Sequence, residues 1–420
     1  MIRTLIARAS HQGAPTLGRN TAILLVSNIG GAALSFVIAA VIGRALGERG
    51  LGVYAVAMAW VYPLSLVVEF GLGTLMTRDL AGQPERAHDY LIDVIRVRLL
   101  LGVPTLLVLI AAAPLLSSDS EIVAGLHVSA PLVLIVPLTG AFTAVFRAQE
   151  RMTPVAALNV GMLAAQAALT AVVLAAGAGV VVVLIVNTAT SAGQLVAAWG
   201  MYRATSPPNP LTVSERGRSL LRRAFPFALA ALFAALQNRL SIIMLENLTT
   251  TAEVGLFAAA YRFTEAARMF PNAFFGAIFP TLTALAADPA RMERTFRRAL
   301  VGLTAFGIAS GVGLTIFAPI LLTLIYGDAF AAGASSLALL SWALALSVLR
   351  GLWTIRAYAH RRESRVNAVN ALVIALQVAL GLVLIPRFGV DGAALTHLII
   401  EAAALMLFAG LGWGDARTNA

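Results

Sequence analysis

The placement of arginine is the feature that most constrains this chain. All thirty of its basic residues are arginine. Twelve apolar segments divide the sequence, and the arginines lie almost entirely in alternate gaps between them. If Arg350 is assigned to the gap after the tenth segment, 24 arginines lie in the amino-terminal stretch, the even-numbered gaps and the tail. The odd-numbered gaps hold only Arg44, Arg49 and Arg387. Because positively charged loops stay in the cytoplasm, this pattern predicts a polytopic membrane protein with both termini inside.

Each of the twelve segments is long enough to cross a bilayer, since a hydrocarbon core of about 30 Å requires about 20 helical residues. The composition agrees: 59% of the residues are hydrophobic and 12% are charged, which is too little charge to cover a water-soluble surface. We therefore predict an all-α fold and interpret the net charge of +10 as a sign of membrane orientation, not of nucleic-acid binding. The segments are 21–43, 51–76, 99–116, 122–146, 154–176, 180–200, 224–246, 254–283, 299–325, 334–355, 366–385 and 392–412.

Several functional classes are disfavoured by what the sequence lacks. Cysteine is absent and the five histidines are scattered, so we expect no metal site and no cofactor. The first segment is too long for the apolar part of a signal peptide, so we expect it to remain a span of the inner (plasma) membrane. Each outer loop has fewer than ten residues, which leaves no room for the covering loop of an external glycan enzyme. Transport is favoured over catalysis.

An internal repeat relates the two halves of the chain. An offset of 203 residues pairs the second segment with the eighth and aligns Gly52 with Gly255. An offset of 211 residues pairs the fifth segment with the eleventh and aligns Asn159 with Asn370. Alanine-rich helices give chance matches, but matched polar residues are harder to dismiss.

The repeat predicts two pseudo-symmetric lobes of six helices. Six segments is an even number, so both halves have the same topology and are related by an axis along the membrane normal. We predict an amino-terminal lobe at residues 1–200, a cytoplasmic linker at 201–223 and a carboxy-terminal lobe at 224–420. A cleft between the lobes, closed alternately at each face, is the expected substrate path.

Charged residues inside the predicted spans are the main functional candidates, because an arginine near the centre of a membrane helix costs roughly 2.5–3.5 kcal/mol and requires a partner or water. Arg239 and Arg262 are predicted to lie at one depth, about 10–12 Å below the outer surface at about 1.5 Å per residue. Glu265 lies three residues from both Arg262 and Arg268, so one helix face carries all three with net positive charge. Pro271 interrupts the same helix, and broken helices commonly line transport cavities.

Several of these residues allow a second interpretation. The arginines could form a salt-bridge network that only locks the helices together. Glu69 either faces the cavity or pairs with Arg78. His397 and Glu401 have the i and i+4 spacing of a proton relay, although a polar contact between helices is favoured. Embedded amides are interpreted as interhelical hydrogen bonds worth about 0.6 kcal/mol each, among them Asn28 and Asn238.

Short motifs occur in a characteristic order along the chain. They include RALG at 44–47, GVY at 52–54, VGLFAAAYRFTE at 254–265, FP at 279–280 and YG at 326–327. In their order and spacing over twelve spans they resemble the oligosaccharide flippases of the Wzx type, within the multidrug/oligosaccharidyl-lipid/polysaccharide exporter superfamily. The resemblance implies a MATE-like pair of six-helix lobes.

The resemblance also implies a function: movement of a polyprenyl-pyrophosphate-linked oligosaccharide from the inner to the outer leaflet for surface polysaccharide biosynthesis. A glycan polymerase or ligase is a further candidate partner. Arginine suits this cargo because it binds phosphate oxygens bidentately and keeps its charge when desolvated. We assign substrate binding to Arg262, Arg239, Arg268 and Arg44. Supporting or coupling roles go to Glu265, Glu69, Asn238, Asn28, His397 and Glu401.

Two other functions stay open. A cation-coupled multidrug antiporter of the same superfamily is the main alternative, but it would be expected to have an acid-lined cation site, and the intramembrane arginines favour an anionic cargo. Ser241 stands where relatives often carry an acidic residue, which puts cation coupling at this position in doubt. A membrane-embedded glycan enzyme is less favoured. Lipid II flippases also resemble the chain but typically have two further spans.

Overall fold

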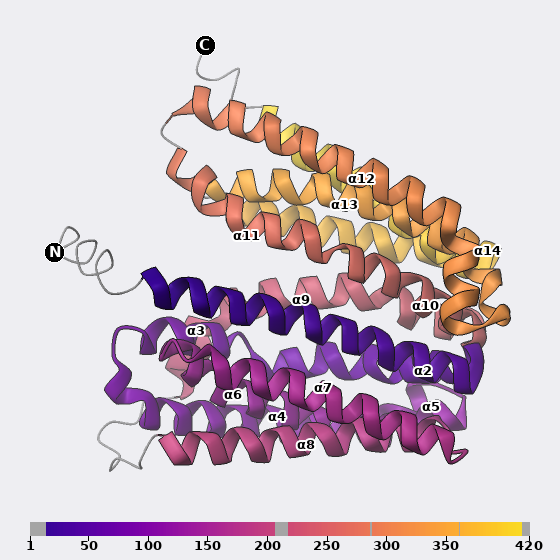
Figure 1. Cartoon of the computed structure of the whole chain (residues 1–420), viewed down its shortest axis with the longest axis horizontal. Coiled ribbons are helices and arrows are strands. Elements are labelled where there is room, and N and C mark those ends of the chain that lie inside the picture. Colours follow the sequence, from indigo (N-terminus) through magenta and orange to yellow (C-terminus); the bar gives the residue numbers. More distant parts are fainter. Residues whose placement is uncertain (1–13, 206–216, 286–287, 361, 414–420) are drawn as a thin grey trace. The chain divides into compact units, whose positions relative to one another are not determined.

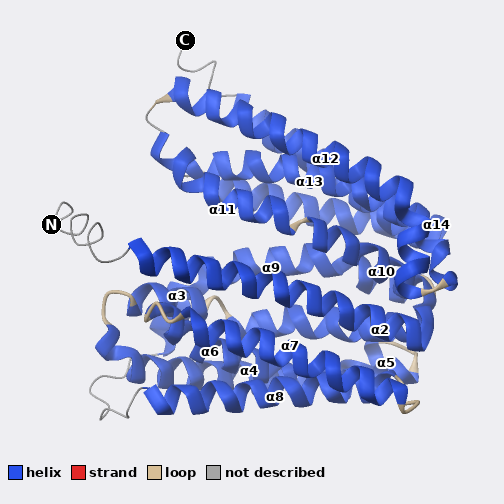
Figure 2. Ribbon diagram, in the orientation of Figure 1, coloured by secondary structure: helices blue, strands red, loops and turns tan. Residues whose placement is uncertain are grey.

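The computed structural model describes residues 14–205, 217–285, 288–360 and 362–413. Every element within these residues is a helix (Figure 2), so the predicted all-α fold is confirmed. The helices up to the predicted linker are α2 (Ala14–Glu69), α3 (Leu72–Leu80), η1 (Pro84–Arg86), α4 (Ala87–Leu116), α5 (Ser120–Ser129), α6 (Leu132–Ala148), α7 (Met152–Ala175) and α8 (Val180–Thr205). Those that follow are α9 (Gly217–Leu248), α10 (Thr251–Ala267), α11 (Met269–Ala284), α12 (Pro289–Tyr326), η3 (Asp328–Gly333), α13 (Ala334–Ala359) and α14 (Glu363–Trp413).

The helices have the length and apolar character of membrane spans. Among the described residues, eight helices are long and apolar enough to cross a bilayer, and counting a bent pair within α9 as one span gives nine. Two of the eight, at 18–69 and 364–410, are far longer than one crossing requires. Each predicted segment falls on helical structure, so the chain is a multi-pass membrane protein. The count of twelve spans stays a prediction.

Glycines with left-handed backbone interrupt the two longest helices. Gly47 has a φ of 68° within α2, and Gly389 has a φ of 54° within α14. Residues with a Cβ rarely adopt this conformation, which glycine reaches at little cost. Both breaks lie in gaps that the sequence places between spans, so α2 and α14 each contain two of the predicted segments.

The predicted eighth span is built from two helices. Helix α10 ends and α11 begins at Arg268, three residues before Pro271. A proline clashes with the preceding turn and disfavours helical backbone in the residue before it. The interruption expected from Pro271 is therefore present, and it places Arg268 at the junction.

The chain divides into two compact units. The first unit contains residues 1–38 and 60–232, and the second contains 39–59 and 233–420. The middle of α2, around the Gly47 break, thus packs with the second unit. The sequence analysis does not predict that residues 39–59 belong to the second unit. The predicted lobes with their linker stay a prediction, and most of that linker lies outside the described residues.

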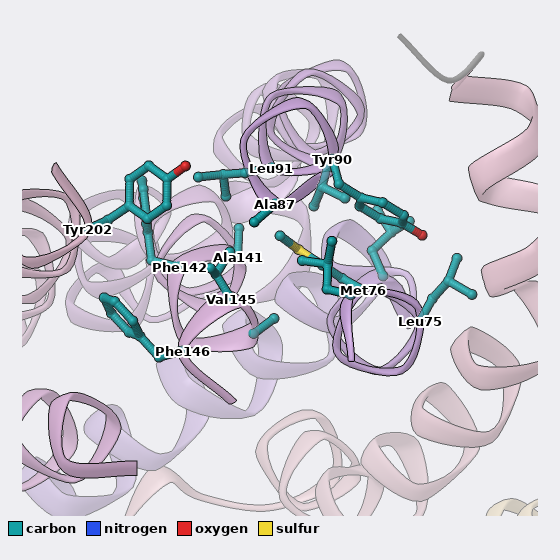
Figure 3. Packing of buried hydrophobic residues seen from close by; sticks show 14 of the residues in the cluster. Leu75, Met76, Ala87, Tyr90, Leu91, Ala141, Phe142, Val145, Phe146 and Tyr202 are labelled. Carbon is teal, nitrogen blue, oxygen red and sulfur yellow. The ribbon is translucent and has the colours of Figure 1, made fainter. Parts of the chain in front are cut away.

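The first unit has an apolar core where α3, α4, α6 and α8 meet (Figure 3). Leu75 and Met76 of α3 and Leu91 of α4 belong to this core, and the Phe142 and Tyr202 rings pack with centroids 5.7 Å apart. In the second unit, one core joins α11, α12 and α13, and another joins α13 to α14. These cores hold the helices that carry the charged residues described next.

Candidate functional site

A group of charged and aromatic residues gathers in the second unit. Its members lie on α9, α10, α13 and α14, helices that are labelled in Figure 1. We call it the arginine cluster. Its α10 helix packs against both α13 and α14. The cluster consists of Arg239, Arg262, Arg268, Arg350, Glu265, Glu401, Tyr261 and His397.

Arg262 and Glu265 form an ion pair along one face of α10, with Arg262 Nη1 3.1 Å from Glu265 Oε2. The pair is the one that the three-residue spacing predicts. The side chains are 26% and 32% exposed, so the pair is reachable from outside the packed helices. Tyr54 and Tyr326 lie within electrostatic range of the Arg262 guanidinium. Arg262 therefore occupies a polar environment built from three separate stretches of the chain.

Arg268 lies where α10 ends and α11 begins. Its guanidinium interacts with the Tyr261 side chain, seven residues or about two helical turns earlier, and lies within electrostatic range of Glu265 and Glu401. Tyr261 is buried and also interacts electrostatically with Arg239 on α9. Tyr261 thus lies among charged residues of three helices, and Arg239 is counted in the cluster through its effect on Tyr261.

Arg350 is a correction to the sequence analysis, which assigned it to a cytoplasmic gap. It lies within α13, five residues before the predicted end of that span, and pairs with Glu401 of α14. Two hydrogen bonds join them: Arg350 Nε donates to Glu401 Oε2 at 2.6 Å, and Nη2 donates to Oε1 at 3.1 Å. The Glu401 side chain is only 5% exposed. Arg350 lies inside the tenth predicted segment, and this position is the sequence signal that could have identified it.

His397 and Glu401 have different surroundings despite their shared helix face. Glu401 is held by Arg350, whereas the buried His397 ring lies 5.9 Å from the Phe257 ring and 5.7 Å from the Tyr261 ring. The His397 Nε2 atom is buried and has no hydrogen-bond partner among the described residues. The proton-relay interpretation stays a prediction.

The cluster carries an excess of positive charge. It contains four guanidinium groups and two carboxylates, so with a neutral histidine its net charge is +2. Both carboxylates are already paired with arginine. Guanidinium groups among apolar helices form strong, charge-assisted hydrogen bonds with anionic groups. The arrangement can therefore bind an anionic group.

Glu69 has a partner that neither interpretation of the sequence named. Its carboxylate accepts hydrogen bonds from the backbone N–H groups of Gly71 and Gly73, at 2.8 and 2.9 Å, and lies 3.4 Å from Arg98 Nη2. Arg78, the predicted partner, pairs with Asp79 instead. The cause is local: left-handed backbone at Phe70 and Gly71 ends α2 and directs the N–H groups of the α3 amino terminus toward the carboxylate.

Arg98 is a second arginine that the sequence analysis placed in a cytoplasmic gap. Its side chain is fully buried within the first unit. Besides Glu69 it contacts the backbone carbonyl of Pro137. A buried charge paired in this way fixes α4 against α6 and the α2–α3 turn. Nothing in its local sequence distinguishes it from a loop arginine.

The remaining candidates are dispersed. Arg44 donates hydrogen bonds to the carbonyls of Leu324 and Ile325, which neutralises the carboxy-terminal end of α12. Its assignment to substrate binding stays a prediction. Asn28 is exposed on α2 in the first unit, and the side chain of Asn238 lies outside the described part of the structure.

Ser241, the departure noted in the sequence, is buried in a neutral polar contact. Gln377 Nε2 donates to Ser241 Oγ at 3.2 Å and to the Gln237 carbonyl at 3.1 Å. These two hydrogen bonds, one to a side chain and one to a backbone carbonyl, join α9 to α14 through uncharged groups. No carboxylate is part of this contact.

Comparisons with known proteins agree with this architecture. The inward-facing structure of a multidrug resistance MATE family transporter of the MOP superfamily has a TM-score of 0.79 at 14% identity, covering 94% of this chain and 98% of that one. The lipid II flippase MurJ, in an inward closed conformation, has a TM-score of 0.77 at 14% identity, covering 92% of this chain and 86% of that one. The MATE-like fold expected from the sequence is confirmed.

Sequence comparisons identify the family. The probable low-salt glycan biosynthesis flippase Agl15 of Haloferax volcanii is 22% identical over 411 residues, covering 94% of this chain and 83% of that protein. The model of the family described as polysaccharide biosynthesis protein matches residues 17–286. Because this match covers well over half of the sequence, the chain belongs to the polysaccharide biosynthesis protein family.

Proposed function

We propose that this protein is a flippase that carries a polyprenyl-pyrophosphate-linked oligosaccharide from the inner to the outer leaflet of the plasma membrane. The observation that carries the proposal is the arginine cluster, a concentration of positive charge on membrane helices. The similarity to a protein named as a probable glycan biosynthesis flippase supports the same cargo class. In this proposal both termini lie in the cytoplasm, and a glycan polymerase or ligase receives the exported glycan.

The chemistry of the cluster suits a pyrophosphate. Arg262 lies within α10 and Arg268 lies at the α10–α11 break, and a guanidinium can form two parallel hydrogen bonds to phosphate oxygens. A guanidinium keeps its charge in a low-dielectric path, where an ammonium would more readily lose a proton. Glu265 pairs with Arg262 along α10 and holds its side chain in place.

Binding must remain weak enough for release. The carboxylates of Glu265 and Glu401 compete with the cargo for arginine. When the pyrophosphate leaves, Glu265 pairs again with Arg262 and Glu401 with Arg350. A cluster with only arginines would hold an anion too tightly and would be costly when empty. The arginines thus alternate between carboxylate and pyrophosphate partners. This exchange suits transport, because no covalent bond of the cargo is broken.

A transport measurement tests the proposal. The purified full chain is reconstituted into liposomes with a fluorescent polyprenyl-pyrophosphate oligosaccharide, and outer-leaflet glycan is removed by an added glycosidase. A flippase makes nearly all of the glycan accessible, whereas protein-free liposomes leave about half protected. Efflux of cationic dyes driven by an ion gradient, without any glycan movement, would instead establish the antiporter alternative.

A further inference from the structure

A second feature of the second unit is a groove between α11 and α12, with a volume of about 490 Å³. This size is within the range of about 300–1,000 Å³ that holds small molecules. Both walls are regular helix faces. Phe270, Phe274 and Ile278 line it from α11, and Arg298, Gly302 and Phe306 line it from α12.

The lining is apolar along most of the groove and charged at one end. The Phe270 and Phe306 rings meet with centroids 6.3 Å apart, and Phe270 is 73% exposed. Arg298 lies eight residues from Phe306, a distance of about 12 Å along the helix. The groove is therefore mostly apolar, and Arg298 lines its part nearer the amino terminus of α12.

The charged end lies toward the amino terminus of α12, which also carries Arg291, Arg294 and Arg297. The positive-inside rule places such a segment at the cytoplasmic surface. Arg298 then lies at the depth of lipid phosphates in the inner leaflet, and the aromatic wall extends from there toward the bilayer centre.

We propose that this groove binds the isoprenoid chain of the lipid-linked cargo, with Arg298 contacting the phosphate next to the chain. The proposal rests on the proposed function, because that function supplies a ligand with an apolar chain and an adjacent phosphate. Aromatic side chains at the wall offer contact area along a branched hydrocarbon, and the arginine supplies the complementary charge. The groove holds the carrier lipid, whereas the arginine cluster acts on the pyrophosphate and glycan during the crossing.

Gly302 offers a way to fill the groove without disturbing the packing, because a Cβ at this position meets no atom within 4 Å. Gly313 is the matched control. It lies on the same helix, eleven residues away and therefore on nearly the same face, and its Cβ would also meet nothing within 4 Å, but it does not line the groove. For the charge, Arg297 is the control for Arg298, since both are exposed and only Arg298 lines the groove.

The test uses the full chain in lipid nanodiscs and a polyprenyl monophosphate with a photoreactive diazirine on its isoprenoid chain. We expect crosslinks on α11 and α12, their loss in Gly302→Leu, and their retention in Gly313→Leu. Arg298→Gln is expected to weaken probe binding about tenfold and Arg297→Gln to leave it unchanged. Unlabelled polyprenyl phosphate is expected to displace the probe, and phosphatidylglycerol is not.

Equal displacement by phosphatidylglycerol would overturn the proposal, because the groove would then be a site for ordinary bilayer lipid. Crosslinking unchanged in both Gly302→Leu and Arg298→Gln would overturn it as well. The glycan transport assay on the same wild-type protein separates the two claims. If transport occurs but the crosslinks lie elsewhere, only the assignment of the groove is refuted. If the groove is crosslinked but no transport occurs, only the flippase function is refuted.

Discussion

Gly52 and Gly255 make reciprocal contacts in the second unit: a Cβ at Gly52 would overlap the Thr251 carbonyl, and a Cβ at Gly255 would overlap the Glu48 carbonyl. The offset of 203 residues that aligns the two glycines also aligns Glu48 with Thr251. The contact is therefore symmetric between the second and eighth predicted spans. Small residues permit this close backbone approach between membrane helices.

We predict that Gly255→Ala and Gly52→Ala each destabilise the protein by about 1–3 kcal/mol, because the methyl group meets backbone that cannot move aside. Thermal unfolding in detergent measures the effect. Gly276→Ala is the control, since a Cβ there meets no atom within 4 Å. If the Gly255 variant unfolded at the same temperature as this control, the close approach would be wrong.

The Arg350 and Glu401 pair is predicted to depend on both partners. Arg350→Met alone or Glu401→Leu alone leaves one buried charge without its partner and is expected to lower stability by about 3–5 kcal/mol. The double variant is expected to recover most of that loss. A double-mutant cycle in thermal unfolding measures the coupling, and additive single effects would contradict the pairing.

An exposed pair provides the comparison for that cycle. Arg291 and Asp288 lie 3.4 Å apart with side chains 72% and 46% exposed. Pairs of this kind contribute about 0–1 kcal/mol. Arg291→Ala is therefore expected to change the unfolding temperature very little.

The topology predicts opposite labelling of two introduced cysteines. The natural chain has no cysteine, so no background must be removed. Ser118→Cys, in a predicted outer loop, is expected to react with a membrane-impermeant maleimide in intact cells, and Ser206→Cys, in the predicted cytoplasmic linker, is expected to react only after lysis. Equal labelling of both in intact cells would refute the orientation.

Much of the fold was accessible from the sequence, because bilayer thickness and arginine asymmetry act on every span. The breaks at Gly47 and Gly389 fall in predicted gaps, and the Arg262 and Glu265 pair follows from helical periodicity. Contacts between distant segments were not accessible in this way. Arg98 reaches Glu69 across 29 residues and Arg350 reaches Glu401 across 51. A count of loop charges cannot separate a buried arginine near the end of a predicted segment from an exposed one.

The same limit explains the incomplete prediction of the arginine cluster. Arg239, Arg262, Arg268 and Glu265 were found because each is a charged residue inside a predicted membrane span. Tyr261 has no such signature, since aromatic residues are common in membrane helices. Its role as the neighbour of charges from several helices depends on the packing of α10 against α13 and α14.

The most direct test of the account is glycan transport by an Arg262→Ala variant, normalised to the amount of protein in the membrane. We predict that transport per molecule falls at least about tenfold while the protein remains folded and inserted, because a charge-assisted contact to the pyrophosphate is lost. Arg262→Lys is expected to recover only part of the activity, since an ammonium lacks the bidentate geometry. Arg294→Ala, at the exposed amino-terminal end of α12, is the control. Normal transport per molecule in Arg262→Ala, with only the membrane level reduced, would show that the cluster merely holds the helices together and would contradict the account.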